Sequence, residues 1–152
     1  MLYRSWNRAV CLSGAMLAVL CLLVGCAVPE NRVVYKDVNV GTWQQSATIE
    51  FSYSEEPRCS DVDLLLHVNR NFRPCDLGFE VTVITPDSLR YTEQIFISAT
   101  MLPPMVTDRM EDIKIPYRRD MELAKKGEYN IVITPLAPLS DVEAVGVNFQ
   151  LK

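Results

Sequence analysis

The 152-residue chain holds 19 acidic and 15 basic residues, and its formal net charge is −4. Nucleic acid and anionic headgroup layers are therefore poor partners, because both would be repelled. The length suits one domain with a real core, and six unclustered glycines exclude a phosphate-binding glycine loop, so no cofactor is expected.

The start of the chain has the layout of an export signal rather than of a folded element. Arg4 and Arg8 give it positive charge, and residues 9–28 contain no charged side chain. A positive start followed by an apolar core and small residues is typical of a secretory signal peptide. An uncleaved membrane helix is the alternative, since the run is about as long as a span requires. Ser13, Gly14 and Gly25 weaken that alternative.

The end of this apolar run, Leu23-Val24-Gly25-Cys26, resembles the lipobox of bacterial lipoproteins. Gly25 supplies the small side chain that a signal peptidase requires beside the scissile bond. The resemblance implies that the Cys26 thiol receives a diacylglycerol, that residues 1–25 are cut away, and that the new amino group is acylated. Each buried methylene stabilises membrane attachment by about 0.8 kcal/mol, so several acyl chains make it close to permanent.

The predicted organisation is a lipoprotein signal peptide over residues 1–25, a lipidated cysteine with a tether over residues 26–42, and one domain over residues 43–152. Loss of the signal leaves 127 residues with a net charge near −6. Within the tether, residues 33–35 (Val-Val-Tyr) carry a short β pattern.

Short stretches of alternating apolar and polar residues follow one another along the predicted domain, as in half-buried strands. The expected strands are residues 48–53, 62–68, 78–83, 89–97, 113–117, 128–134 and 144–151. In the first of them, Ile49, Phe51 and Tyr53 share one face. Pro57 ends this strand, and Pro86-Asp87-Ser88 predicts the turn of a hairpin.

Two segments depart from this pattern. Residues 98–112 contain three methionines around Pro103-Pro104 and predict a long loop over one end of the core. Pro116 is expected to stop a strand, and residues 121–126 then predict one or two helical turns, with Asp120 as the N-cap. Because short strands dominate, the sequence predicts an all-β fold, an antiparallel β-sandwich of the jelly-roll or immunoglobulin-like type.

Two cysteines remain once the signal peptide and the lipid site are set aside, namely Cys59 and Cys75. A cysteine pair in an exported chain can form a disulfide, worth on the order of 3 kcal/mol for a loop of this length. Two free, buried thiols are the alternative. Metal ligation is not expected, because His67 is the only histidine and no Cys-x-x-Cys pair occurs.

The sequence offers no convincing catalytic set, so we expect no enzymatic activity. His67 lies in a strand pattern on the face opposite Leu64 and Leu66, and no Gly-x-Ser-x-Gly elbow accompanies it. Asp61 and Asp63 share one face of an extended strand. Glycoside cleavage needs two carboxylates across a cleft, and calcium needs a denser set of oxygen ligands.

A proline-closed loop after residue 68 is the predicted partner contact. It presents Arg70, Asn71, Phe72 and Arg73, and arginine and aromatic residues are enriched in contact patches. The alternative is a stiff connection with solvated arginines.

Several features of the mature chain occur in a recognisable order. A tryptophan follows the lipobox, a strand leads into Val68-Asn69-Arg70-Asn71, and Gly127-Glu128-Tyr129 and Val145-Gly146-Val147 mark later strands. Together with Pro74, Leu77 and the Pro86-Asp87 turn, this order resembles the gliding-motility lipoprotein H family. Residues 98–112 replace the Gly-Trp-rich turn of that family, so the resemblance is to a divergent member.

The resemblance implies a non-catalytic lipoprotein of the bacterial cell envelope, associated with a gliding or protein-secretion apparatus. Its expected partners are a membrane, through the lipid anchor, and envelope proteins; an outer-membrane location is expected. The alternative is a carbohydrate-binding or polysaccharide-handling surface lipoprotein, in which Trp43 and Tyr53 form a sugar-stacking platform. Core packing is the other explanation for these two aromatic residues.

Overall fold

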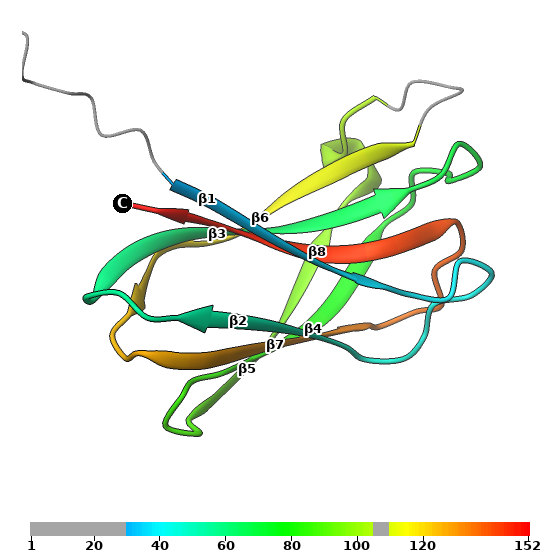
Figure 1. Cartoon of the computed structure of the whole chain (residues 1–152). Helices are drawn as coiled ribbons and strands as arrows, with labels where there is room; N and C mark the ends of the chain where they lie inside the picture. Colours follow the sequence, from blue (N-terminus) through cyan, green and yellow to red (C-terminus); the bar gives the residue numbers. More distant parts are fainter. Residues whose placement is uncertain (1–29, 105–109) are drawn as a thin grey trace, which may run out of the picture.

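The computed structural model describes residues 30–104 and 110–152, which form eight strands and one short 3₁₀ helix (Figure 1). The elements are β1 (Glu30–Asp37), β2 (Ala47–Tyr53), β3 (Arg58–Val68), β4 (Leu77–Ile84), β5 (Arg90–Ile97), η1 (Ala99–Met101), β6 (Glu111–Leu123), β7 (Gly127–Pro135) and β8 (Val142–Leu151). The predicted signal peptide and Cys26 lie outside the described residues. Within the described ranges, no helix has the length and apolar character needed to span a bilayer.

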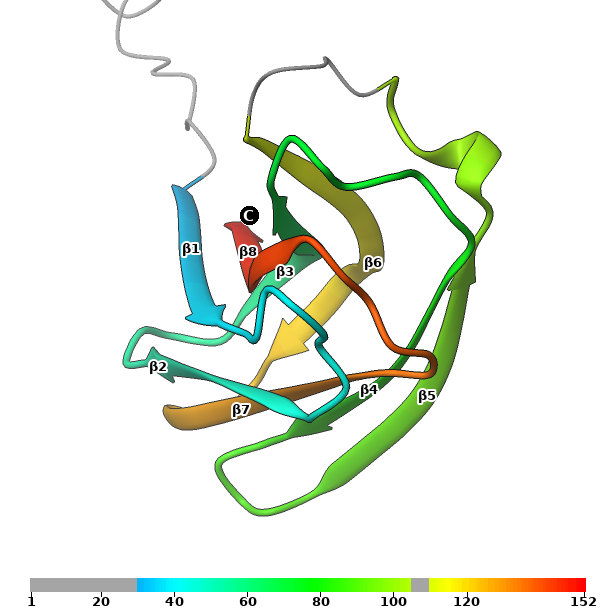
Figure 2. The ribbon, with the colours of Figure 1, turned by 90° about the vertical axis from the view of Figure 1, so that its right-hand side faces the viewer.

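The strands build two antiparallel sheets that face each other (Figure 2). Sheet A has the order β1-β8-β3-β6, and sheet B has the order β2-β7-β4-β5. This order is the jelly-roll arrangement of two Greek keys. The predicted all-β sandwich is therefore confirmed, and of the two types expected the strand order is that of the jelly roll.

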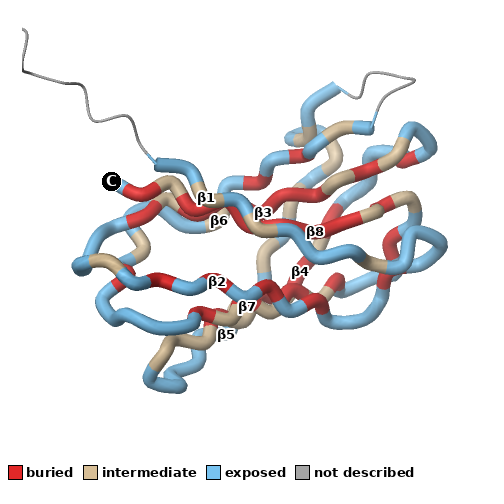
Figure 3. The backbone as a smooth tube through the Cα atoms, in the orientation of Figure 1, coloured by how far each residue is buried: buried red, intermediate tan, exposed pale blue. Residues whose placement is uncertain are grey.

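Buried residues alternate with more exposed ones along several strands (Figure 3). Because successive side chains of a strand point to opposite faces, the buried row of each sheet packs against the other sheet. Ile49, Phe51 and Tyr53 of β2 are all buried, as predicted. Phe51 stacks on Phe149 of β8 with ring centroids 3.9 Å apart. Because the two rings come from different sheets, this contact joins the sheets at the centre of the core.

The first strand lies inside the segment that was predicted to be a tether. β1 pairs with β8 along its whole length, from Glu30 opposite Leu151 to Asp37 opposite Ala144. Tyr35 covers Gly146, where a Cβ atom would lie 2.6 Å from the tyrosine ring, so β8 needs glycine at that position. Residues 30–37 therefore belong to the folded sandwich, and the predicted domain boundary at residue 43 is too late.

The predicted strand at residues 113–117 is confirmed, but the predicted strand end at Pro116 and the helix at residues 121–126 are wrong. β6 continues through Pro116 to Leu123, so there is no strand end at the proline and no helix after it. β6 is an outer strand that pairs only with β3, and an outer strand tolerates a residue without an N–H group. Asp120 adopts a φ of 52° and donates its backbone N–H to Asp61 Oδ1 at 3.0 Å, instead of capping a helix.

Candidate functional site

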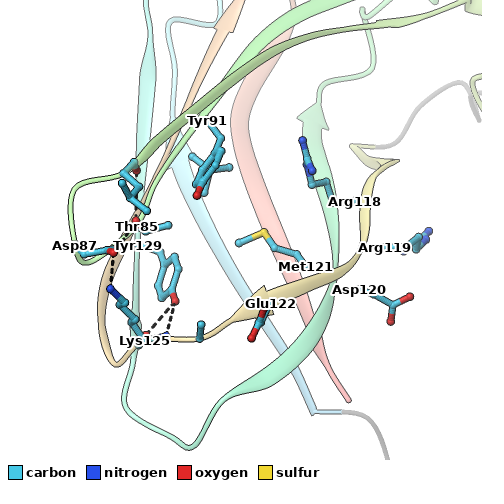
Figure 4. Close-up of a pocket in the computed structure, with 13 residues that line it drawn as sticks. Thr85, Asp87, Tyr91, Arg118, Arg119, Asp120, Met121, Glu122, Lys125 and Tyr129 are labelled. Atoms are coloured by element: carbon cyan, nitrogen blue, oxygen red, sulfur yellow. Dashed lines mark hydrogen bonds and ion pairs between the residues drawn. The ribbon is translucent and has the colours of Figure 1, made fainter.

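A groove with a volume of about 390 Å³ lies between the β4–β5 hairpin and the last part of β6 (Figure 4). Its floor is apolar and includes Val83, Tyr91, Met121 and Ala124, and Leu89 lines its mouth. Charged side chains, including Asp87, Arg118 and Lys125, form the rim. In Figure 4, Tyr91 and Met121 face the hollow from different sheets, whereas Arg119 and Asp120 point away from it. We call this feature the β5–β6 groove.

The groove exists because the sandwich is open on the side of β5 and β6, the outer strands of the two sheets. The pairing of β3 with β6 shifts register on both sides of Val62, and such irregularities bend a strand. Val83, on the inner face of β4, is buried, whereas Tyr91, its pairing partner on β5, is 55% exposed. The outer part of the apolar layer is therefore open to solvent.

A polar clamp connects β5 and β6 beside the groove. Glu93 Oε1 accepts hydrogen bonds from Tyr117 Oη at 2.7 Å and from Arg118 Nε and Nη2 at 2.9 and 2.6 Å. Burial acts to raise the pKa of Glu93, but these donors outweigh it and hold the pKa below its ordinary value. Burial, followed by the Glu93 hydrogen bond, raises the pKa of Tyr117 to about 12. The clamp is therefore an ionised carboxylate held by neutral and cationic donors.

Tyr129 fixes the turn at the other end of the groove. Its hydroxyl donates to the Lys125 carbonyl oxygen at 3.0 Å and accepts from the Lys125 backbone N–H at 3.2 Å. The Lys125 ammonium pairs with Asp87 on the β4–β5 hairpin and lowers the pKa of that carboxyl. Gly127 has a φ of 136°, and a Cβ atom there would lie 2.7 Å from Pro86 Cβ. The β6–β7 turn and the hairpin are thus in direct contact.

Replacing Tyr129 with phenylalanine is expected to lower the free energy of unfolding by about 1–2 kcal/mol, because one hydroxyl serves both backbone groups of Lys125. Urea denaturation measures the change. Tyr91→Phe is the matched control, since this ring is half exposed and its loss of a hydroxyl should change stability by less than about 0.5 kcal/mol. Equal effects of the two substitutions would contradict this role of Tyr129.

The predicted partner contact is only partly at the surface. Asn69 forms a turn in which its side-chain oxygen accepts the Asn71 N–H at 2.8 Å and its carbonyl oxygen accepts the Phe72 N–H at 3.1 Å. This turn directs Phe72 into the core, where it is buried. The prediction is therefore wrong for Phe72, while Arg70, Asn71 and Arg73 are exposed and stay predicted contact residues.

The structure does not bring Cys59 and Cys75 together. Cys59 lies at the start of β3, whereas Cys75 follows the far end of that strand, and both are free and exposed. The strand from Cys59 to Val68 alone spans about 30 Å, and a disulfide requires Cα atoms within about 7 Å. The predicted disulfide is therefore not formed, and the alternative of two buried thiols is also wrong.

His67 and the aspartates of β3 make contacts that hold strands together. His67 Nδ1 lies 2.8 Å from Asp112 Oδ1 on β6. Asp63 is fully buried, and its carboxylate accepts from Gln150 Nε2 at 2.6 Å and pairs with Lys114 Nζ at 2.9 Å. Further ion pairs join Asp61 and Asp63 to Arg119.

Asp61 and Asp63 therefore pair with basic and amide side chains, and they do not face each other across a cleft as glycoside cleavage requires. Among the residues that the structure describes, no group of three or more His, Cys, Asp or Glu side chains could hold a metal ion.

The two aromatic residues of the predicted sugar platform are buried in the core. Trp43 and Tyr53 are each 2% exposed. Trp43 packs against Phe79 with ring centroids 5.9 Å apart and donates its indole N–H to the Gln45 carbonyl oxygen at 2.6 Å. The platform prediction is wrong, and core packing accounts for both residues.

The groove was missed because its walls come from a strand and from a segment predicted as a helix. The alternation in residues 89–97 does place Tyr91, Glu93 and Ile95 on one face of β5, and this is the face that points toward the core. In the sequence, that alternation indicates the groove wall formed by β5. The opposite wall, with Met121, required knowledge that β6 continues as a strand.

Comparisons with known proteins do not assign this chain to a family. No protein-family model matches the chain, and no curated protein matches it. Among solved structures, the chain aligns with a chain described as the structure of infectious bursal disease virus Gx strain, at 14% identity and a TM-score of 0.14. The alignment covers 83% of this chain and 40% of the viral chain. A similarity this low supports no conclusion about fold or function.

Proposed function

We propose that this chain is a lipid-anchored, non-catalytic binding domain of the bacterial cell envelope, located at the outer membrane. In this role it resembles the gliding-motility lipoprotein H family, whose members are associated with a gliding or protein-secretion apparatus. The lipobox-like Leu23-Val24-Gly25-Cys26 ends only four positions before Glu30, the first residue of β1. Lipidation at Cys26 would confine the domain to a thin layer and raise its effective concentration for partners in the membrane.

The observation that carries the binding role is the β5–β6 groove. It combines an apolar floor with a charged rim, which is the composition of protein interfaces with a desolvated centre and a polar edge. Arg118 pairs with Glu93 and Lys125 with Asp87, so these rim side chains have partners that favour one arrangement before a partner protein binds. Such preorganisation reduces the entropy lost on association. The proposed occupant is a segment of an envelope protein with an apolar side chain at its centre.

Chemical crosslinking in intact cells, followed by mass spectrometry, tests this assignment. Met121→Glu places a charge on the apolar floor and is expected to reduce the yield of the partner crosslink about tenfold, which corresponds to about 1.4 kcal/mol of binding free energy. Met101→Glu is the matched control, because Met101 is 77% exposed on η1, away from the groove. It should leave the crosslink yield unchanged.

Thermal unfolding of both purified variants separates a binding defect from a folding defect. An equal crosslink yield for Met121→Glu and the wild type, with both folded, would contradict the groove as the contact site. Arg70→Ala tests the loop predicted from the sequence in the same assay. A crosslink lost in Arg70→Ala and kept in Met121→Glu would move the contact to that loop.

A further inference from the structure

One end of the sandwich gathers the start of β1, the end of β8 and three turns (Figure 1). Glu30 pairs with Leu151, and the backbone N–H of Lys152 donates to the Cys59 carbonyl oxygen at 3.0 Å. The turns at residues 54–57, 85–89 and 124–126 lie at this same end, because each joins strands that meet there. We call it the proximal end. The opposite, distal end holds the loops at residues 69–76 and 136–141.

The proposed lipid site is close to the proximal end along the chain. Four residue steps separate Cys26 from Glu30, and an extended chain of that length reaches at most about 14 Å. The eleven residues of β3 span about 36 Å. A lipid surface that holds Cys26 therefore lies near the proximal end, and the distal loops are separated from it by most of the length of the sandwich.

The side chains of the proximal end suit contact with a lipid interface. Leu89 is 51% exposed at the tip of the β4–β5 hairpin, and apolar and basic side chains together are typical of interfacial anchors. Four ion pairs join a lysine to a carboxylate at this end: Lys125 with Asp87, Lys126 with Glu56, and Lys152 with both Asp61 and Asp120. The three lysines offset most of the charge of these four carboxylates. Zwitterionic headgroups have no net charge, so the net acidic character of the chain does not oppose contact with them.

We propose that the domain stands on the membrane on its proximal end, with Leu89 in the interfacial layer of the lipid. This proposal rests on the lipid anchor at Cys26 proposed above and adds the face that meets the bilayer. The mouth of the β5–β6 groove, which Leu89 helps to line, then opens beside the lipid. Arg70 and the rest of its loop face away from the membrane.

The two exposed thiols report on this orientation, because Cys59 lies at the proximal end and Cys75 at the distal end. In the acylated chain, Cys75→Ser leaves Cys59 as the labelling site, and Cys59→Ser leaves Cys75. Each variant is purified in its acylated form, without residues 1–25, and a small fluorophore is attached to the remaining free thiol. The protein is then reconstituted in phosphatidylcholine vesicles that contain a lipid with a nitroxide quencher on its headgroup. The label at Cys59 is expected to be quenched several-fold more than the label at Cys75. Equal quenching, or stronger quenching at Cys75, would overturn the orientation.

Leu89→Asp tests the contact itself, since an exposed turn residue can be changed with little effect on folding. In the Cys59-labelled protein, this substitution should reduce quenching while flotation with the vesicles stays unchanged. Undiminished quenching would exclude Leu89 from the interface. Mass spectrometry of the amino-terminal peptide keeps the two proposals distinct. A chain without acyl groups refutes the anchor, whereas an acylated, floating chain with equal quenching refutes only the orientation.

Discussion

Cys26→Ser is expected to abolish acylation and to leave residues 1–25 attached, so that the chain accumulates as the precursor. The lipobox reaction requires a sulfur nucleophile, and a serine hydroxyl stays protonated where a cysteine thiol can supply a thiolate. The variant should incorporate no labelled palmitate and should migrate more slowly than the processed wild type. Metabolic labelling and gel mobility of the envelope fraction measure both effects.

Cys21→Ser is the matched control, because Cys21 lies in the same apolar run but outside Leu23-Val24-Gly25-Cys26. It should be acylated and cleaved like the wild type. Normal processing of Cys26→Ser would refute the lipobox assignment. An uncleaved membrane helix gives a different result, since the wild type and both variants would then all retain residues 1–25 and none would be labelled.

Local alternation was sufficient to predict the strands whose two faces differ clearly. β2, β4, β7 and β8 include all the residues expected from the sequence, and β5 includes all of them except Leu89, which lies in the turn before it. Only residues 33–35 of β1 showed a β pattern, because five of its eight residues are charged or amide residues. The pairing of β1 depends on β8, more than a hundred positions away in the chain. The part of β6 after Pro116 was misassigned, because a proline normally ends a strand and is acceptable here since β6 is an outer strand of sheet A.

The candidate site could not be predicted to the same extent, since it depends on how the two sheets are placed. The β5–β6 groove is formed by outer strands of different sheets, and no local pattern indicates that Tyr91 and Met121 face one hollow. The cysteines illustrate the same limit. Cys59 and Cys75 are sixteen positions apart in the sequence, a separation that permits a disulfide, but β3 places them at opposite ends of the sandwich. A buried carboxylate such as Asp63 likewise depends on donors from β6 and β8.

Phe149→Ala is expected to reduce the free energy of unfolding by about 3–5 kcal/mol, the cost of truncating a buried aromatic side chain. Phe149 is completely buried and stacks on Phe51 of the opposite sheet, so its loss leaves a cavity between the sheets. For a domain whose total stability is about 5–15 kcal/mol, that is a large fraction. Denaturant unfolding followed by tryptophan fluorescence measures the change.

The chain contains its own control for this substitution, because Phe96 is 73% exposed on β5. Phe96→Ala removes the same atoms from the surface and should cost less than about 1 kcal/mol. Phe51→Ala combined with Phe149→Ala should cost less than the two single substitutions added together, since each single change already breaks the shared stack. Additive costs would mean that the rings stabilise the sheets independently, and that the contact does not hold the two halves of the jelly roll together.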